Sequence, residues 1–342
     1  MRSNEGYRAV HYIMFSIAAL TVMVLCVCVG SVNIPVRSTL LVVRNALLNR
    51  EIPEGMSKSI ILSVRLPRVL SVALVGASLS LCGGAMQGLL RNPLADGSTL
   101  GVSSGASLGA VIAIALGVKI PGFPFADTMG MAMLFAFGSL VAILSLSYRL
   151  DSSLATNTII LVGVIFSMFV NALMSLIITF SSENIKAITF WTMGSLTGST
   201  YSNVITLLVA MALCGAVLIC RARELNAFAV GEDNARHVGV NVRRVKLIVM
   251  IAVSALIGVC VSIGGTIGFV GLVTPHMTRM LAGPNHRRLL PASMFMGAIF
   301  LMLADLVARV ALNPLELPIG VVTSLIGAVA FIIIFRGSRR TI

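Results

Sequence analysis

Residues 247–278 read "LIVMIAVSALIGVCVSIGGTIGFVGLVTPHMT", a run of 32 residues without Asp, Glu, Lys or Arg. A helix that spans a bilayer needs about 20 apolar residues, so the run is too long for one span. The stretch "GGTIGFVG" (264–271) in its second half is rich in glycine, which weakens helices. We therefore predict two helices here, at about 245–263 and about 270–283.

The rest of the chain has the same character. Hydrophobic residues make up 57% of the 342 residues and charged residues 11%, well below the roughly 25% of soluble domains. This composition predicts an all-α polytopic membrane protein, with residues 1–342 forming one transmembrane domain. The other uncharged windows are 9–36, 69–90, 97–118, 128–148, 152–182, 187–220, 289–304 and 317–335. With the divided window they give ten transmembrane helices.

The N-terminal window follows Arg2 and Arg8, as the apolar core of a signal peptide would. Its apolar core, residues 9–30, is longer than a typical signal core, and no A-x-A site follows, so we interpret it as the first span. The six cysteines all lie in apolar windows without metal-ligand spacing, and we predict no metal site.

The basic residues predict the orientation. With the N-terminus inside, 15 of the 25 Lys and Arg residues fall in inner segments. Ten spans then place both termini in the cytoplasm of a bacterial inner membrane. The formal net charge of +13 is explained by this topology, and we expect membrane lipid, not nucleic acid, around the chain.

Two stretches resemble each other. "GGAMQGLLRNP" (83–93) and "GGTIGFVGLVTP" (264–275) both run from a glycine pair through Gly-Leu to a proline. Because they would start spans of opposite direction, they indicate an inverted repeat of the kind found in transporters. Gly101, Gly105 and Gly109 recur every four residues, which predicts close packing against another helix.

One polar segment, residues 222–243, interrupts the apolar chain. Its core, "NAFAVGEDNARHVGV" (226–240), fits two very short helices capped by Gly231 and Gly239. Glu232 and Asp233 would begin the second helix and Arg236 would lie near its end, matching the helix dipole. The segment is either a solvated loop or a docking surface. We expect Phe228 and Val238 to be exposed, which favours a docking surface for a cytoplasmic partner.

Several motifs then resemble the FecCD family, the permeases of bacterial ABC importers for iron-siderophores and cobalamin. They are "RLPRVL" (65–70), "GAMQGLLRNPLADGSTLGVSSGASLGA" (84–110), "FWTMGSL" (190–196), "GEDNARHVGV" (231–240), "GFVGLVTPHMTRMLAG" (268–283), "ADLVARV" (304–310) and "LPIGVVTSLIGAVAF" (317–331). The resemblance covers nearly the whole chain. Gly97 departs from it, because the family often has proline there.

The resemblance implies the type II ABC importer permease fold with ten helices. It also implies a second permease subunit, in a homodimer or heterodimer, two cytoplasmic ATPase subunits and an extracytoplasmic binding protein. The coupling residues would be Leu225, Phe228, Gly231, Glu232, Asp233, Ala235, Arg236 and Gly239. The chain has no G-x-x-x-x-G-K-[ST] motif, so we expect no enzyme activity and no cofactor of its own. ATP and Mg would be bound by the ATPase subunits.

Three arginines are expected at the outer surface: Arg65, Arg68 and Arg309. They could contact lipid headgroups, whereas the resemblance implies that they pair with acidic residues of the binding protein. Asp305 lies one turn before Arg309 and is interpreted as its i,i+4 partner.

Ser167, Asn171, Ser175 and Thr179 recur every four residues in the fifth span. They would line the transport pathway or hydrogen-bond to a neighbouring helix. The cargo implied by the resemblance is a ferric siderophore, with haem or cobalamin as alternatives. An ion-coupled secondary transporter is the alternative from another class, although it should carry acidic or histidine relays in its spans.

Overall fold

The structure, a computed structural model, describes residues 9–30, 32, 34–48, 50, 56–118, 126–152 and 155–338. The elements there are almost entirely helical. The α-helices are α1 (Ala9–Cys28), α2 (Val36–Leu47), α3 (Met56–Ser59), α4 (Leu66–Leu90), α5 (Val102–Ala115), α6 (Ala126–Leu150), α7 (Thr156–Phe180), α8 (Ile185–Thr192), α9 (Tyr201–Cys220), α10 (Ala222–Val230), α11 (Glu232–His237), α12 (Val242–Gly264), α13 (Val270–Ala282), α14 (His286–Val310) and α15 (Ile319–Ser338). A π-helical stretch, Ile60–Arg65, joins α3 to α4.

Ten helices correspond to the ten predicted spans. Among the residues that the structure describes, seven helices are long and apolar enough to cross a membrane: α1, α4 with its π-helical extension, α6, α7, α9, α12 and α14. Shorter apolar helices lie at Val102–Ala115 and Ile319–Ile333, and α13 is the tenth. The divided window is confirmed, because α12 ends at Gly264 and α13 begins at Val270.

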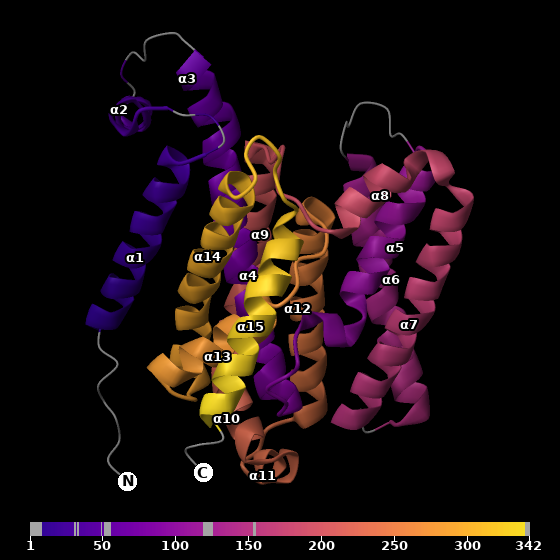
Figure 1. The fold of residues 1–342 in the computed structure, drawn as a ribbon. Coiled ribbons are helices and arrows are strands. Elements are labelled where there is room, and N and C mark those ends of the chain that lie inside the picture. The colour runs from indigo at the N-terminus through magenta and orange to yellow at the C-terminus, as the bar shows by residue number, and fades with distance from the viewer. Residues whose placement is uncertain are drawn as a thin grey trace.

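Helix α4 is the central element. It packs against α9, α12, α13 and α14, and 89% of the residues in its most apolar window are buried. Figure 1 shows α4 behind α14 and α15, with α5–α8 forming a second group on the far side of α12. An apolar helix buried on all sides is expected at the centre of a membrane bundle.

Glycines allow this close packing. A Cβ on Gly76 would collide with the carbonyl of Gly297 in α14, and a Cβ on Gly83 would collide with the carbonyl of Gly271 in α13. Small residues at such crossings let helix backbones approach each other in a membrane. The predicted packing role of the α5 glycines is matched too, since a Cβ on Gly109 would meet the backbone of Met131 in α6.

The two similar glycine stretches have an inverted arrangement. Helix α4 descends from α3 and is followed by the short α5, whereas α12 rises from α11 and is followed by the short α13 (Figure 1). With 14 and 13 residues, α5 and α13 are about 20 Å long, less than the roughly 30 Å of a bilayer core. The stretches also meet, because Gln87 donates to the carbonyl of Leu272 at 3.1 Å.

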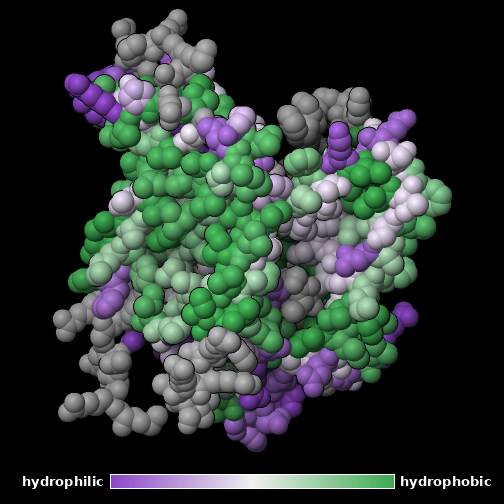
Figure 2. Space-filling view, viewed as in Figure 1, coloured by the Kyte–Doolittle hydropathy of each residue, from purple (hydrophilic) through white to green (hydrophobic). Residues whose placement is uncertain are grey.

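The surface separates into an apolar side and polar ends. Figure 2 shows a largely apolar lateral surface, with hydrophilic residues gathered at the α10–α11 end and at the opposite end. The start of α1 and the end of α15 lie at the α10–α11 end (Figure 1). This agrees with an even number of spans.

A side chain at Gly83 should loosen the centre of the bundle. We expect Gly83→Ala to cost about 1–3 kcal/mol, because its methyl group would meet the backbone of α13, which cannot rotate away. The matched control is Gly138→Ala on α6, where a Cβ meets nothing within 4 Å. Thermal unfolding in detergent should show a lower midpoint for Gly83→Ala only. Equal midpoints would contradict the packing role.

Candidate functional site

The polar segment folds as the two predicted short helices, α10 and α11. Helix α10 lies against α4 and α14 and buries its apolar face: Leu225 and Phe228 are both fully buried. The expectation that Phe228 is exposed is therefore wrong, because the apolar side of this short helix completes the core. Val238, after α11, is 72% exposed as expected.

The two short helices end at Gly231 and Gly239 as predicted, but the two glycines differ in backbone conformation. Gly239 has φ +86°, in the left-handed range. Gly231 has φ 129° and ψ 150°, so it is extended at positive φ and is not a left-handed cap. Only glycine adopts this conformation readily. Gly231 thus ends α10 and sharply redirects the chain into α11.

Helix α11 has an exposed face and one charged anchor. Asp233 and Arg236 form an i,i+3 ion pair of 3.0 Å on the surface, with side chains 86% and 54% exposed. Ala235 is buried beneath them. Glu232 turns inward instead, and its carboxylate lies 2.6 Å from the amine of the fully buried Lys246 in α12. This partner was missed from the sequence, where Lys246 counted only as a basic residue of an inner segment.

Helix α10 is held by a different contact, which the sequence analysis also did not predict. The carboxamide oxygen of Asn226 accepts a hydrogen bond of 2.8 Å from the backbone N–H of His286, at the start of α14. The Asn226 amide donates to the side chain of Asn285 at 2.9 Å. Helix α10 is thereby fixed to α14.

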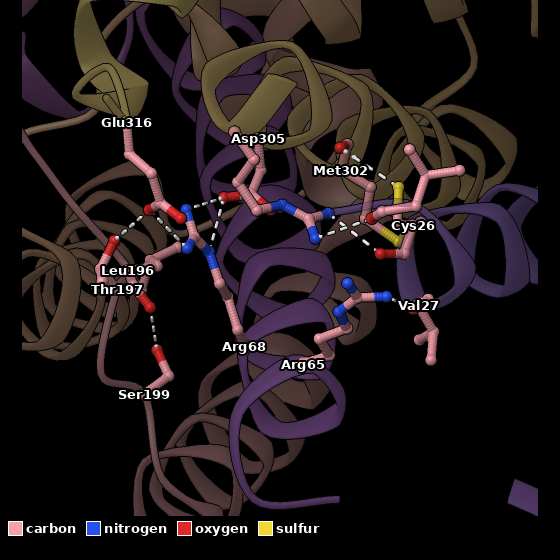
Figure 3. Close-up of polar contacts among 12 residues, drawn as sticks. Cys26, Val27, Arg65, Arg68, Leu196, Thr197, Ser199, Met302, Asp305 and Glu316 are labelled. Atoms are coloured by element: carbon pink, nitrogen blue, oxygen red, sulfur yellow. Dashed lines mark hydrogen bonds and ion pairs between the residues drawn. The ribbon is translucent and has the colours of Figure 1, made fainter. Parts of the chain in front are cut away.

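The three expected outer arginines lie at the end opposite α10 and α11, but they point into the protein. Arg65, Arg68 and Arg309 are only 3–6% exposed. Figure 3 shows Arg68 between two carboxylates. Its guanidinium is 2.9 Å from Asp305 and 2.8 Å from Glu316 in the loop between α14 and α15.

Asp305 joins two of these arginines. Its second oxygen is 2.9 Å from Nε of Arg309, one turn later in α14, so the predicted i,i+4 pair is confirmed. Asp305 is 1% exposed, and a buried carboxylate is tolerated only when paired. Arg68, Asp305, Arg309 and Glu316, together with Arg65, form what we call the outer arginine network. Glu316 had no signal in the sequence, since it pairs across 248 positions.

The network also holds the end of α1. Arg309 donates to the carbonyls of Cys26 and Val29, each at 3.1 Å. Arg65 donates to the carbonyl of Cys28 at 3.0 Å, and to those of Val27 and Val32. The last carbonyls of a helix lack partners within the helix, and cations are favourable there. The expected exposed rim is therefore replaced by an internal clamp, and docking of a binding protein on these arginines stays a prediction.

A cavity of 490 Å³ lies where α5 and α13 begin. Asn171 of α7 is one of its polar lining residues, with Asp96, Ser103, Ser104 and Thr266. Apolar residues of α12, Ile257 and Val261, line it as well. The cavity therefore touches both short helices and the two long helices α7 and α12.

The predicted polar stripe of α7 is only partly at this cavity. Of its four residues, Asn171 is among the described lining residues, and Ser167, Ser175 and Thr179 are not. The hydroxyls of Ser175 and Thr179 donate to carbonyls one turn back, at 3.0 and 2.9 Å. A repeat of four residues follows one helix face only approximately, so the stripe drifts away from the cavity.

Comparison with known proteins gives the class. A solved structure described as an inward-facing conformation of a metal-chelate type ABC transporter superposes with a TM-score of 0.85 at 31% identity, covering 96% of this chain and 100% of that chain. The architecture is thus the type II ABC importer permease fold. The FecCD transport family model matches residues 18–337. The chain belongs to the FecCD transport family.

Two relatives extend this result. The uncharacterized ABC transporter permease protein YvrB of Bacillus subtilis (strain 168) is 43% identical, over 99% of this chain and 98% of its own length. The cobalamin import system permease protein BtuC of Halobacterium salinarum is 38% identical, over 83% of this chain and 75% of its own length. The chain is a multi-pass permease of an ABC importer. The family match suggests no catalytic domain within it.

Removing the shared carboxylate should break the outer arginine network. We expect Asp305→Asn to cost about 3–5 kcal/mol, because it leaves Arg68 and Arg309 buried without their common counter-charge. Glu316→Gln is the matched control and should cost about 1 kcal/mol or less, since the Glu316 side chain is 29% exposed to solvent. Thermal unfolding in detergent measures both. A larger loss for Glu316→Gln would contradict the central role of Asp305.

Proposed function

We propose that this permease carries a ferric siderophore across the bacterial inner membrane, driven by ATP hydrolysis in partner subunits. Two cytoplasmic ATPases would bind the α10–α11 end, where α1 begins and α15 ends. A second permease subunit would complete the pathway, and an extracytoplasmic binding protein would deliver the cargo at the opposite end. ATP and Mg would be bound by the ATPases and not by this chain.

The cavity is the observation that carries the cargo proposal. Its 490 Å³ fall within the range of sites for organic ligands, about 300–1,000 Å³. Its described polar lining is made of hydroxyls, the Asn171 amide and the Asp96 carboxylate, without Lys or Arg. Relatives are described as permeases for cobalamin and for molybdate. In a lining without Lys or Arg, the Asp96 carboxylate would repel a small oxyanion such as molybdate, whereas the hydroxyls and the amide suit a polar organic chelate.

The α10–α11 end supports the coupling proposal. Its exposed face presents Asp233, Arg236 and Val238 around glycines with fixed unusual geometry. Leu225, Phe228 and Ala235 support this face from beneath. An exposed surface on a buried, rigid base is suited to receive motion from a partner.

Cobalamin is the second candidate cargo, favoured by the relative from Halobacterium salinarum. Haem remains a candidate through the family resemblance alone.

Uptake into liposomes separates the cargoes. The chain is reconstituted with its ATPase subunits and its binding protein, and supplied with ⁵⁵Fe on hydroxamate, catecholate and carboxylate siderophores or with ⁵⁷Co-cobalamin. We expect ATP-dependent uptake of one ⁵⁵Fe-siderophore class and none of cobalamin. Asn171→Leu should reduce uptake roughly five-fold, the effect of losing about one hydrogen bond of 1 kcal/mol.

The matched control for that variant is Asn157→Leu, an exposed residue at the other end of α7. It should take up cargo at the wild-type rate. Uptake of cobalamin without ⁵⁵Fe would overturn the siderophore proposal, and uptake unaffected by Asn171→Leu would remove the cavity from the pathway.

A further inference from the structure

The ion pair of Lys246 with Glu232 lies at a junction of three helices. Glu232 begins α11, and Lys246 belongs to the second turn of α12. The hydroxyl of Thr156, the first residue of α7, donates to the same carboxylate oxygen of Glu232 at 3.0 Å. One carboxylate therefore ties α11 to the beginnings of both α7 and α12.

This junction is the polar attachment of α11 to the membrane domain, beside the apolar one made by Ala235 in the core. Of its six residues, Ala235 is buried and Glu232 half-buried, while the other four are exposed. The Lys246 side chain is 0% exposed, so its charge cannot be hydrated where it lies. A buried ammonium without its counter-charge is strongly unfavourable. Glu232 therefore cannot withdraw from α12 without a large loss of free energy.

Helix α10 is attached elsewhere. It packs on α4 and α14, and Asn226 bonds the start of α14. Between α10 and α11 stands Gly231, with its extended backbone at positive φ. The chain passes from α10 to α11 through this single glycine, across which Asn234 donates to the carbonyl of Val230 at 3.0 Å. Each short helix is also fastened to its own set of spanning helices.

Both helices reached through α11 line the cavity, which also touches α4 at Leu79. Asn171 and Met174 of α7 line it, as do Ile257 and Val261 of α12. A rigid helix carries a displacement along its length, and Asn171 lies about 22 Å along α7 from Thr156. A shift of α11 would reach the cavity wall through these two helices, while the α4–α14 body stays with α10.

We infer that the Glu232–Lys246–Thr156 cluster is the joint that transmits movement of α11 to α7 and α12, and that Gly231 is the hinge separating this movement from α10. The inference rests on the proposed ATP-driven function and names the residues that position its moving parts. Glu232 then acts inside the permease, and the ATPase need not contact it.

The test uses the complete complex with its ATPase subunits in nanodiscs. Amide hydrogen exchange is compared with and without ATP plus vanadate at residues 159–163 and 245–249. Ile159 and Val245 are chosen as starting points because their amides make backbone hydrogen bonds in the first turns of α7 and α12. Wild type should show a nucleotide-dependent change in exchange at both places.

The decisive variant is the double substitution Glu232→Leu with Lys246→Met, which removes both charges and the oxygen that accepts from Thr156, and leaves no charge buried alone. We expect the nucleotide-dependent change in exchange at α7 to fall roughly ten-fold, while the ATPases remain bound. Thr156→Val, which removes only the hydroxyl, should weaken the change at α7 and spare α12. If the double variant fails to fold, Thr156→Val alone tests whether the cluster transmits movement to α7.

The matched control is Arg221→Gln. It breaks the 2.8 Å ion pair between Arg221, which precedes α10, and Glu224 in the first turn of α10. Its exchange should respond to nucleotide as wild type does. If the nucleotide-dependent change in exchange at α7 is undiminished in the double variant, the joint is overturned and the proposed function still stands. The same holds for Thr156→Val if only that variant folds. A wild-type complex that neither binds ATPase subunits nor hydrolyses ATP overturns both.

Discussion

The contact of glycine backbones along α4 is the constraint on which the bundle depends. At Gly76 and Gly83 the neighbouring helix comes so close that a single methyl group would strike the carbonyl of Gly297 in α14 or of Gly271 in α13. Within lipid, apolar side chains gain little from leaving their surroundings, so helices associate through close packing and hydrogen bonds. The glycines provide the close packing that places α13 and α14 against the central helix.

That packing also positions the short helices. Because α13 is held against α4 near Gly83, its first residues and the loop before it stay within the bundle, beside the start of α5. Backbone without regular structure is tolerated at membrane depth only where protein or a water-filled space surrounds it. The cavity at the start of α5 and α13 is consistent with this rule, and it places polar side chains such as Ser103 and Thr266 where a cargo could pass.

Buried charges fix the two ends of the bundle in the same physical way. At one end Asp305 holds Arg68 and Arg309, which in turn meet α1 and the loop before α15 (Figure 3). At the other end Glu232 holds Lys246. Each cluster joins different segments: α4, α14 and the loop before α15 at one end, and α11 and α12 at the other. The clusters therefore resist separation of those segments. Removing one charge of a pair costs most free energy where its partner is least exposed to solvent.

The spans could be predicted from the sequence because each reflects local composition. The break near Gly264 and the two turns around Gly231 are local as well, and both were located correctly. Phe228 was misplaced because an apolar face on a short helix indicates burial or docking equally well. The partners Lys246 and Glu316 were missed because such pairs join distant parts of the chain. The outward direction assumed for Arg65, Arg68 and Arg309 failed because nearby carboxylates and carbonyls were not visible in sequence.

The account depends most on the α10–α11 end facing the cytoplasm, where ATPases would bind. The direct measurement is labelling of Asn234→Cys, an exposed α11 position, in a background without native cysteines, using a membrane-impermeant thiol reagent. Ser182→Cys, exposed between α7 and α8 at the opposite end, is the control. In intact cells, with any outer membrane permeabilised, Ser182→Cys should react and Asn234→Cys should react only after the inner membrane is opened. Labelling of Asn234→Cys in intact cells, with Ser182→Cys protected, would contradict the orientation and the coupling role of this end.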